Sequence, residues 1–365
     1  KGTGVMLIAG TGSIAWARDE RGVMHRVGGW GQDVGDEGSG YWLVMEALRC
    51  VARAEDKCCG PQAVMDARSV ADKLNIPYYL VDESKEFQRD VIDYFASEYK
   101  AGRTPNPCVM CNEKLKFGNL IDRARKLGAE YVATGHYARL EQRNGRTVLL
   151  RGKDARKDQT YFLFSLGQEQ LAHMMFPLGE LQKSETREVA RCVNLKTAEK
   201  QESQEICFVP DKDYKKFLTT AGLVEEHRGE IVDTRGQVLG HHDGIEFYTI
   251  GQRKGLGISS PTPMYVIELD PENNREGVGG EALLLRDEFR IDRCNWIAFE
   301  RLAKPIEASA AIRYNHPGTE ATVIPGENGQ ATVKLREPQR AVTPGQACVF
   351  YQDDLVLGGG WIMRN

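Results

Sequence analysis

The sequence lacks any run of about eighteen apolar residues, which excludes a helix long enough to span a membrane. Its nine cysteines in 365 residues are too few, and odd in number, for a disulfide-stapled secreted domain. The glycine-rich first residues lack the small-residue cleavage pattern of a secretory signal. We found no internal repeat and no low-complexity tract. We therefore expect a cytoplasmic protein, with no membrane partner, whose cysteines are thiols.

Basic residues are not in excess either, because the formal net charge is −4. This balance argues against a uniformly basic nucleic-acid-binding protein, although a basic face can coexist with an acidic remainder. Hydrophobic residues make up 41% of the chain and charged residues 27%, which indicates packed cores rather than disorder. The length allows two or three domains.

Pattern and composition divide the chain into four parts. Residues 1–49 are dense in glycine, and residues 50–209 alternate between strand and helix patterns. Residues 210–270 are mixed and rich in turns, and residues 271–365 have an all-β pattern. We therefore predict an α/β domain, a small central domain and a C-terminal β-domain.

The α/β part shows four predicted elements. Pro77–Asp82 and Glu130–Thr134 are short apolar segments typical of buried strands. Glu113–Leu127 is predicted to be a helix that Gly128 ends. A second helix carries an apolar stripe at four-residue steps, formed by Phe87, Val91, Phe95 and Tyr99. Alternating strands and helices predict a parallel sheet with its sites at the carboxyl ends of the strands.

The all-β part alternates between apolar and polar residues. Ile306–Ile312 alternates, and Ala321–Ile324 and Ala331–Leu335 flank a Pro-Gly-Glu-Asn-Gly turn typical of a hairpin. Ala341–Tyr351 and Leu355–Ile362 continue the pattern across Asp353-Asp354. A small closed barrel is the arrangement that removes exposed sheet edges.

Two cysteines lie three residues apart in Thr104-Pro-Asn-Pro-Cys108-Val-Met-Cys111-Asn112. The two prolines place Cys111 at or near the start of the following helix, where the helix dipole lowers the pKa of a thiol. The same pair could be half of a zinc site, but no second CxxC or His-x-His accompanies it. A plain buried pair of thiols is the other alternative.

A third candidate is Cys207, in Glu202-Ser-Gln-Glu-Ile-Cys207-Phe-Val-Pro210. Its apolar neighbours predict a short strand or loop packed on the domain. From these residues alone, a core cysteine and a catalytic cysteine both remain open for Cys207.

The order of several motifs resembles one enzyme family. The chain contains, in sequence, TPNPCVMCN, VATGHYARL, KDQTYFL, FPLGELQK, SQEICFVP, YTIGQRKGLGI, AVTPGQACVFY and LGGGWI. Together they resemble the tRNA-specific 2-thiouridylase (MnmA/TrmU) family over about residues 51–365. The resemblance implies an α/β catalytic domain of the PP-loop ATPase (HUP-like) type, incomplete at its N-terminus. It also implies a central tRNA-binding domain and a C-terminal β-barrel.

The implied activity is ATP-dependent transfer of persulfide sulfur to C2 of the wobble uridine in tRNA. ATP, with Mg²⁺, would activate the C2 oxygen, and no redox cofactor or bound metal is implied. Cys207 matches the cysteine that carries the persulfide, loaded by a sulfur-carrier protein. Cys111 matches the nucleophile that then closes a disulfide with it. Because 207 − 111 = 96 positions separate the two cysteines, the fold must bring two loops together.

The resemblance implies softer roles for further residues. Gly135 matches a backbone contact to ATP, and the segment facing the target base matches Asn106, Pro107 and Cys108. The implied tRNA contacts are His136, Lys157, Asp158, Gln159, Arg313, Tyr314 and Gln346. Without the family, His136 could equally be a core or capping histidine, and Lys157 an ordinary solvated charge. Many members have Asp where this chain has Cys108, which leaves the proton-handling group unassigned.

Residues 1–49 depart from the family pattern. The Ser-Gly-Gly-x-Asp-Ser loop that cradles ATP is absent from them. Ile8–Ser13 and Gly28–Trp42 instead resemble a fragment of an N-acetylglucosamine-kinase/BadF-type ATPase. We expect a chimeric, inert fragment; the alternative is that Gly10-Thr-Gly-Ser13 serves as a replacement phosphate loop.

Three functions therefore compete. The chain could be an active tRNA sulfurtransferase, or a catalytically impaired tRNA-binding chimera that lacks ATP activation. A sugar kinase would explain only the first 49 residues. AMP release that depends on both ATP and tRNA separates the first two.

Overall fold

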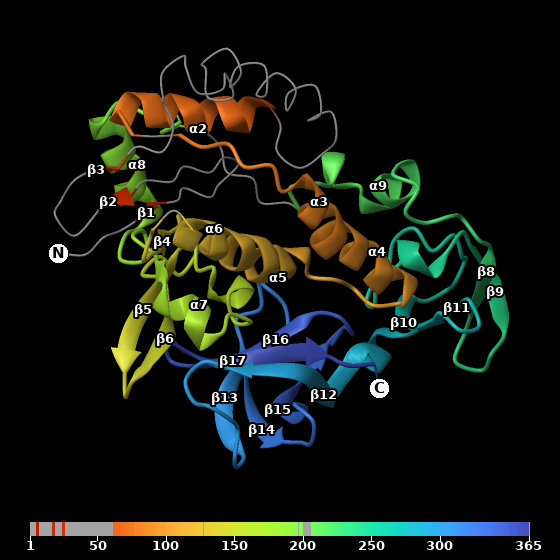
Figure 1. The fold of residues 1–365 in the computed structure, drawn as a ribbon. Coiled ribbons are helices and arrows are strands. Elements are labelled where there is room, and N and C mark those ends of the chain that lie inside the picture. The colour runs from red at the N-terminus through yellow and green to blue at the C-terminus, as the bar shows by residue number, and fades with distance from the viewer. Residues whose placement is uncertain are drawn as a thin grey trace.

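The computed structural model describes residues 5–6, 17–18, 24–25, 61–76, 78–126, 128–195, 197–199 and 206–364. These ranges form three sheets and a set of helices (Figure 1). No helix within them is both long and apolar enough to cross a membrane. Apart from three two-residue strands, the kinase-like fragment predicted for residues 1–49 lies outside the described residues, and so does Gly10–Ser13.

The first sheet has the order β3-β2-β1-β4-β7. Strand β1 is parallel to β4, and β4 is parallel to β7, so the predicted parallel pairing is confirmed for these three strands. Strands β2 and β3 are antiparallel and make the sheet mixed. The strand predicted at Glu130–Thr134 is also confirmed, in a shorter form. The strands are β1 (Val5–Met6), β2 (Ala17–Arg18), β3 (Met24–His25), β4 (Val132–Ala133) and β7 (Met174–Met175).

Two continuous helical segments, which we call helical rods, follow in the α/β part of the chain. The first runs through α3 (Ser84–Phe87), η2 (Gln88–Ile92) and α4 (Asp93–Lys100), and the second through α5 (Pro107–Met110), η3 (Cys111–Asn119) and α6 (Leu120–Lys126). The predicted stripe is confirmed, because Phe87, Val91, Phe95 and Tyr99 are all buried. The second rod begins at Pro107 rather than at Glu113, since proline needs no hydrogen-bond partner at the first helical position. The remaining α-helices are α2 (Pro61–Leu74), α7 (Gln168–Ala172), α8 (Lys183–Cys192) and α9 (Tyr214–Thr220).

The strand predicted at Pro77–Asp82 is wrong for its described residues, 78–82, which form no strand. Tyr78 packs with Ile76 against a small apolar cluster on α2, and its hydroxyl lies 3.5 Å from the Val64 carbonyl oxygen. Val81 and Asp82 are exposed. The apolar run therefore packs against a helix, and it pairs with no strand among the described residues.

The C-terminal part is the predicted closed barrel. Its strand order is β12-β15-β14-β13-β16-β17, and a β12–β17 pairing closes the ring. The strands are β12 (Leu285–Trp296), β13 (Ile306–Ala311), β14 (Thr319–Pro325), β15 (Ala331–Arg340), β16 (Ala347–Gln352) and β17 (Leu355–Ile362). The predicted hairpin is confirmed by the pairing of Pro325 with Ala331.

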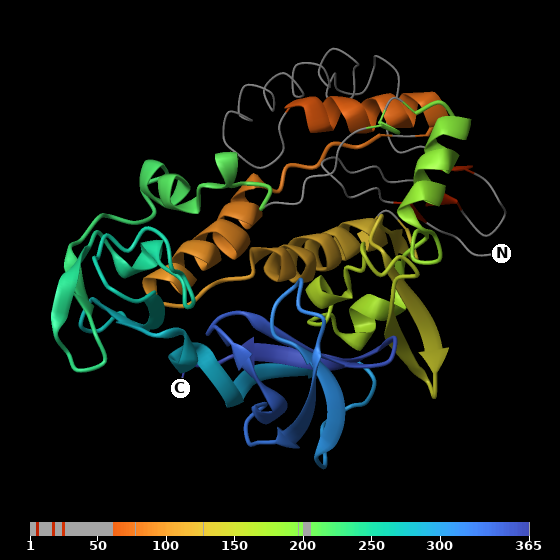
Figure 2. The ribbon, with the colours of Figure 1, turned by 180° about the vertical axis from the view of Figure 1, so that it is seen from behind.

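Two further β-structures flank the barrel on opposite sides (Figures 1 and 2). The hairpin of β5 (Ala138–Arg143) and β6 (Arg146–Arg151) joins the barrel through the pairing of Leu150 with Leu355. The middle sheet has the order β10-β11-β8-β9. Its strands are β8 (Gly229–Val232), β9 (Val238–His242), β10 (Tyr265–Asp270) and β11 (Arg275–Gly279).

The second helical rod lies between two hydrophobic cores. Val109 and Phe117 face the cluster that also contains barrel residues such as Val349, which we call the central core. Leu115 faces a cluster built by α4 and the middle domain, including Phe208, which we call the lateral core. Residues of this rod are therefore fixed from both sides by apolar packing.

One carboxyl group is buried in the middle domain without a hydrogen-bond partner. Glu276 on β11 is 0% exposed, and neither of its carboxylate oxygens accepts a hydrogen bond from the described residues. Burial raises its pKa to about 8, and the attraction of Lys215 lowers it only partly. Tyr214 and Tyr248, whose pKa values burial also raises, face the same carboxyl group.

Glu276→Gln should remove a pH dependence of stability. A carboxyl group whose pKa is higher in the folded state stabilises that state most when protonated. The free energy of unfolding should therefore fall as pH rises from 4.5 to about 8, by about 1.4 kcal/mol for each unit by which the two pKa values differ. Urea unfolding at a series of pH values between about 5 and 9 measures this change in the free energy of unfolding. Glu272→Gln, on the exposed turn before β11, is the control, and equal pH profiles for the two variants would contradict the assignment.

Candidate active site around the cysteine helix

The loop before the cysteine helix is held by the barrel. The Thr104 backbone N–H donates to the Pro344 carbonyl oxygen over 2.8 Å. The Gln346 side-chain amide donates to the carbonyl oxygens of Thr104 and Pro105, each over 3.1 Å. Gln346, for which a tRNA contact is predicted, therefore fixes the backbone that leads into the cysteine motif. Its tRNA contact stays a prediction.

Gly345 allows the two backbones to approach this closely. Its φ is +87°, which L side chains rarely adopt. A Cβ at this position would lie 2.8 Å from the Arg103 Cβ and 2.9 Å from the Thr104 carbonyl oxygen. Only glycine fits between the barrel and this loop without displacing one of them.

The motif Asn106–Cys111 forms the start of the helical rod. Asn106 is the N-cap residue and is 7% exposed, and Pro107 occupies the first turn. Cys108 and Cys111 follow within the first two turns, both partly buried. Burial raises the pKa of Cys108 to about 11, so its side chain is a neutral thiol at physiological pH. Among the residues that the structure describes, no three His, Cys, Asp or Glu side chains form a metal-binding group.

Cys111 and the two neighbours of Cys207 pack at the same hydrophobic cluster. Cys111 packs against the lateral core from the helical rod, and Ile206 packs against it from the other segment. Phe208 lies inside this core, with its ring centroid 5.2 Å from that of Phe95. Cys207, between these two apolar residues, lies on an exposed turn. The predicted packed loop is thus confirmed, and the fold brings two segments 96 positions apart to one core.

An aromatic pair lies beside the rod. The Asn112 amide donates to the Phe162 carbonyl oxygen over 3.1 Å. The Asn112 side-chain oxygen is buried and has no hydrogen-bond partner among the described residues. The Phe162 ring lies 4.3 Å from that of Tyr314, with an angle of 37° between the planes. Tyr314 is 39% exposed, next to the exposed Arg313 on the barrel. The two rings of this pair come from different domains. Together they offer a surface on which a base can stack.

Gly135 and His136 follow the carboxyl end of β4, where ligands bind in parallel sheets. A Cβ on Gly135 would make an ordinary van der Waals contact with the Leu178 side chain, 3.7 Å away. His136 is 5% exposed and its Nδ1 lies 2.8 Å from the Thr134 hydroxyl. Burial, helped by the charge of Lys116, holds its pKa well below the usual range. His136 is therefore neutral and interior in this conformation, and its tRNA contact stays a prediction.

The segment Lys157–Gln159 serves the framework at two of its three positions. Asp158 is buried, and it accepts hydrogen bonds from Arg151 over 3.0 Å and from the Thr160 hydroxyl over 2.8 Å. The Gln159 side-chain oxygen accepts from the Tyr137 N–H over 3.0 Å. Lys157 is partly buried. The predicted tRNA contacts of these residues are not tested by this arrangement.

Two side chains were missed by the sequence analysis. Lys116 is partly buried on η3, forms no ion pair among the described residues, and lowers the pKa of both Cys108 and His136. Phe162 completes the aromatic pair with Tyr314. The only sequence signal for Lys116 was its place on the predicted helix Glu113–Leu127, eight positions after Cys108. Nothing in the sequence pairs Phe162 with a residue 152 positions away (314 − 162).

Comparison with family models finds three matches. Residues 32–211 match the tRNA methyl transferase HUP domain. Residues 215–279 match the tRNA methyl transferase PRC-barrel domain, and residues 286–362 the aminomethyltransferase β-barrel domain. The fold class predicted from the sequence is thereby confirmed. The first match begins inside the segment predicted to be kinase-like, and that resemblance stays a prediction.

Curated relatives match most of the chain. A protein of Clostridium perfringens is 47% identical over 308 residues, which cover 84% of this chain and 86% of the relative. One of Geobacter metallireducens is 50% identical over 308 residues, covering 84% and 83%. One of Acidithiobacillus ferrooxidans is 47% identical over 327 residues, covering 89% and 92%. Each of the three is named tRNA-specific 2-thiouridylase MnmA.

Gly345→Ala should destabilise the protein more than a matched control. The added methyl group meets the backbone of Thr104, and the loop before the cysteine helix must shift. We expect a loss of about 2–3 kcal/mol in the free energy of unfolding. Gly329→Ala has a similar φ of +73° but open space around its Cβ, so it should lose only about 1 kcal/mol. Equal losses in urea unfolding would show that the close approach to Thr104 is unimportant.

Proposed function

The chain belongs to the family of tRNA-specific 2-thiouridylases, and we propose that it replaces the C2 oxygen of the wobble uridine of tRNA with sulfur. The proposed reaction uses ATP to activate the oxygen and a cysteine persulfide as the sulfur source. The observation that supports this proposal within the chain is that Cys111 and both neighbours of Cys207, Ile206 and Phe208, pack at one core.

Sulfur transfer needs two cysteines for a chemical reason. The C2 carbonyl of uridine is a poor electrophile, and its oxygen leaves only after it has been bonded to a phosphoryl group. The outer sulfur of a persulfide on Cys207 attacks C2, and the activated oxygen leaves with AMP. The Cys111 thiolate then attacks the Cys207 Sγ, which breaks the S–S bond and leaves the outer sulfur on the base. A disulfide between the two cysteines remains, and an external thiol must reduce it before the next turnover.

The exposure of the cysteines matches this division of roles. Cys207 lies on an exposed turn, where a sulfur-carrier protein can reach it. Cys111 is partly buried in the helical rod and need only meet Cys207. For the disulfide to form, their Cβ atoms must approach to about 3.5–4.5 Å, which a turn beside the lateral core can accomplish without unfolding it.

Cys108 is not the proton acceptor of the reaction in this proposal. Its pKa of about 11 keeps the thiol protonated at physiological pH. It contributes instead a small neutral side chain beside Cys111. Family members with Asp at the position of Cys108 have a carboxylate there. In this chain, we propose that the phosphate of the leaving AMP or water takes up the proton.

The HUP domain fits the use of ATP. We place the phosphates near the carboxyl end of β4, which Gly135 and His136 follow, and near Lys116, which forms no ion pair among the described residues. A partly buried ammonium group without a counter-ion favours a bound anion. Mg²⁺ is expected to accompany the phosphates. The role of residues 1–49 in binding ATP, and their chimeric origin, stay predictions.

We propose that the aromatic pair and Arg313 form a surface that contacts tRNA. Tyr314 and Phe162 can stack on an unpaired base, and Arg313 can contact a phosphate. Asn106, Pro107 and Cys108 would lie beside the target base, because they form the start of the helix that carries Cys111.

Serine substitutions test the roles of the cysteines. Cys207→Ser and Cys111→Ser should each abolish 2-thiouridine formation with ATP, unmodified tRNA and a persulfide donor, measured by nucleoside mass spectrometry. Cys108→Ser should keep most of the activity, since its thiol does not ionise in the physiological range. Cys192→Ser, an exposed cysteine on α8, is the control. A fully active Cys111→Ser enzyme would refute the two-cysteine mechanism, and an inactive Cys108→Ser enzyme would refute the passive role of Cys108.

A further inference from the structure

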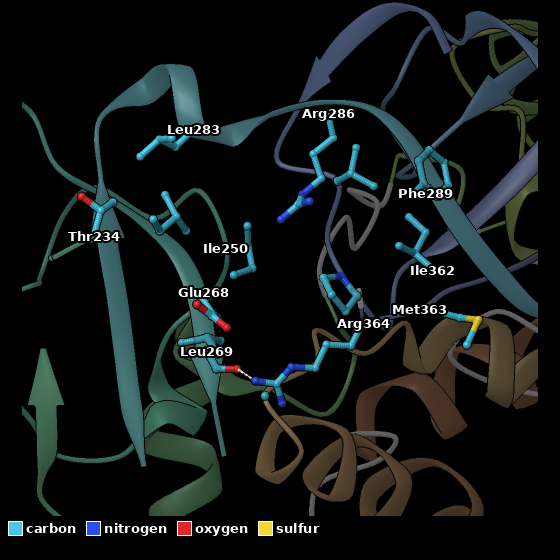
Figure 3. Close-up of a pocket in the computed structure, with 14 residues that line it drawn as sticks. Thr234, Ile250, Glu268, Leu269, Leu283, Arg286, Phe289, Ile362, Met363 and Arg364 are labelled. Atoms are coloured by element: carbon cyan, nitrogen blue, oxygen red, sulfur yellow. Dashed lines mark hydrogen bonds between the residues drawn. The ribbon is translucent and has the colours of Figure 1, made fainter. Parts of the chain in front are cut away.

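A cavity of about 320 Å³ lies between the middle sheet and the barrel (Figure 3). This volume is at the lower end of the size range of ligand pockets, roughly 300–1,000 Å³. Its lining is apolar and polar in about equal parts, with the apolar side chains Ile250 and Leu283 on the side of the middle sheet and Phe289 and Ile362 on the side of the barrel. It therefore suits one flat, partly apolar group.

Three charged side chains face this cavity. Figure 3 shows Arg286, from β12, and Glu268, from β10, pointing toward the same space, with Arg364 below them. Arg364 is fixed, because its guanidinium donates to the Leu269 carbonyl oxygen. The side chains of Arg286 and Glu268 form no hydrogen bond or ion pair among the residues described, not even with each other. A guanidinium and a carboxylate thus present a full set of donors and acceptors to a ligand.

The cavity adjoins the loop that leads to Cys111. Gly102 and Pro344 both line it, and the Pro344 carbonyl oxygen accepts the hydrogen bond from Thr104. A ligand in the cavity would therefore contact the middle domain, the barrel and the base of the cysteine loop together. Such a ligand is well placed to fix the three parts relative to one another.

We infer that this cavity binds a guanine base. Arginine pairs with the O6 and N7 acceptors of guanine, which is the commonest specific contact to this base. A carboxylate accepts hydrogen bonds from its N1–H and N2–H groups. Adenine would turn its amino group toward the guanidinium. Cytosine can accept from the guanidinium at O2 and N3, but it offers the carboxylate one donor nitrogen, where guanine offers two. Apolar residues of the lining, among them Ile250 and Phe289, offer contact surface to the faces of the ring.

The base has two possible sources, a guanosine of the tRNA or a free guanine nucleotide. The first rests on the proposed function, since tRNA is then the substrate. Both sources present the same edges to Arg286 and Glu268, so the chemistry of the site is shared, and the experiment separates them.

The test is equilibrium dialysis of guanosine monophosphate against the full chain, with saturating adenosine monophosphate present to fill the ATP site. Xanthosine monophosphate is the comparison ligand, because it keeps O6 and N7 but places a carbonyl oxygen opposite Glu268. Guanosine monophosphate should bind at least about tenfold more tightly than xanthosine monophosphate, a difference of about 1.4 kcal/mol. Arg286→Met should lose both ligands, and Glu268→Gln should reverse the preference. Arg301→Met and Glu300→Gln, both exposed on the barrel, are the matched controls and should bind as the unaltered chain does.

The source follows from the KM for tRNA in the thiolation assay. A KM raised several-fold in both cavity variants assigns the guanine to tRNA, and an unchanged KM assigns it to a free nucleotide. Absence of saturable binding, equal affinity for the two nucleotides, or unchanged binding in Arg286→Met and Glu268→Gln overturns the inference. Thiolation by the unaltered chain is measured separately, so the inference can fail while the proposed function stands.

Discussion

The contact between the barrel and the loop before the cysteine helix is the constraint on which the site depends. The Thr104 N–H and the two carbonyl oxygens that follow are hydrogen bonded to Pro344 and Gln346, and Gly345 lets the chains touch. These bonds set where the helix starts, and therefore where Cys108 and Cys111 point. The C-terminal barrel thus positions Cys111, the proposed nucleophile, although the two are far apart in sequence.

Much of this arrangement follows from local sequence. The apolar stripe of Phe95 and its neighbours, the hairpin turn at Pro325 and the barrel strands were predicted because their periodicity is strong and local. The strand predicted at residues 78–82 failed, because a short apolar run does not reveal whether it packs on a helix or pairs in a sheet. The helix start at Pro107 was missed because proline is allowed at the first helical position but does not by itself predict that a helix begins there.

The candidate site was predicted in its residue types but not in its contacts. The motifs around Cys111 and Cys207 identified both cysteines, whereas the packing of their two segments at the lateral core joins parts of the chain that are distant in sequence. The same holds for Gln346 and Asp158, which resembled tRNA contacts and turn out to make framework hydrogen bonds. Environment then separates chemically identical groups: burial keeps Cys108 a thiol, while Cys207 lies exposed. No property of a single residue in the sequence carries that distinction.

The central claim is that Cys111 and Cys207 act as one pair across the lateral core. The most direct measurement is peptide mapping by mass spectrometry after a single turnover with persulfide-loaded enzyme, ATP and tRNA, in the absence of reductant. The account predicts one new disulfide, between Cys111 and Cys207, in an amount equal to the 2-thiouridine formed. A disulfide between Cys108 and Cys111, or 2-thiouridine formed with both cysteines still reduced, would contradict it.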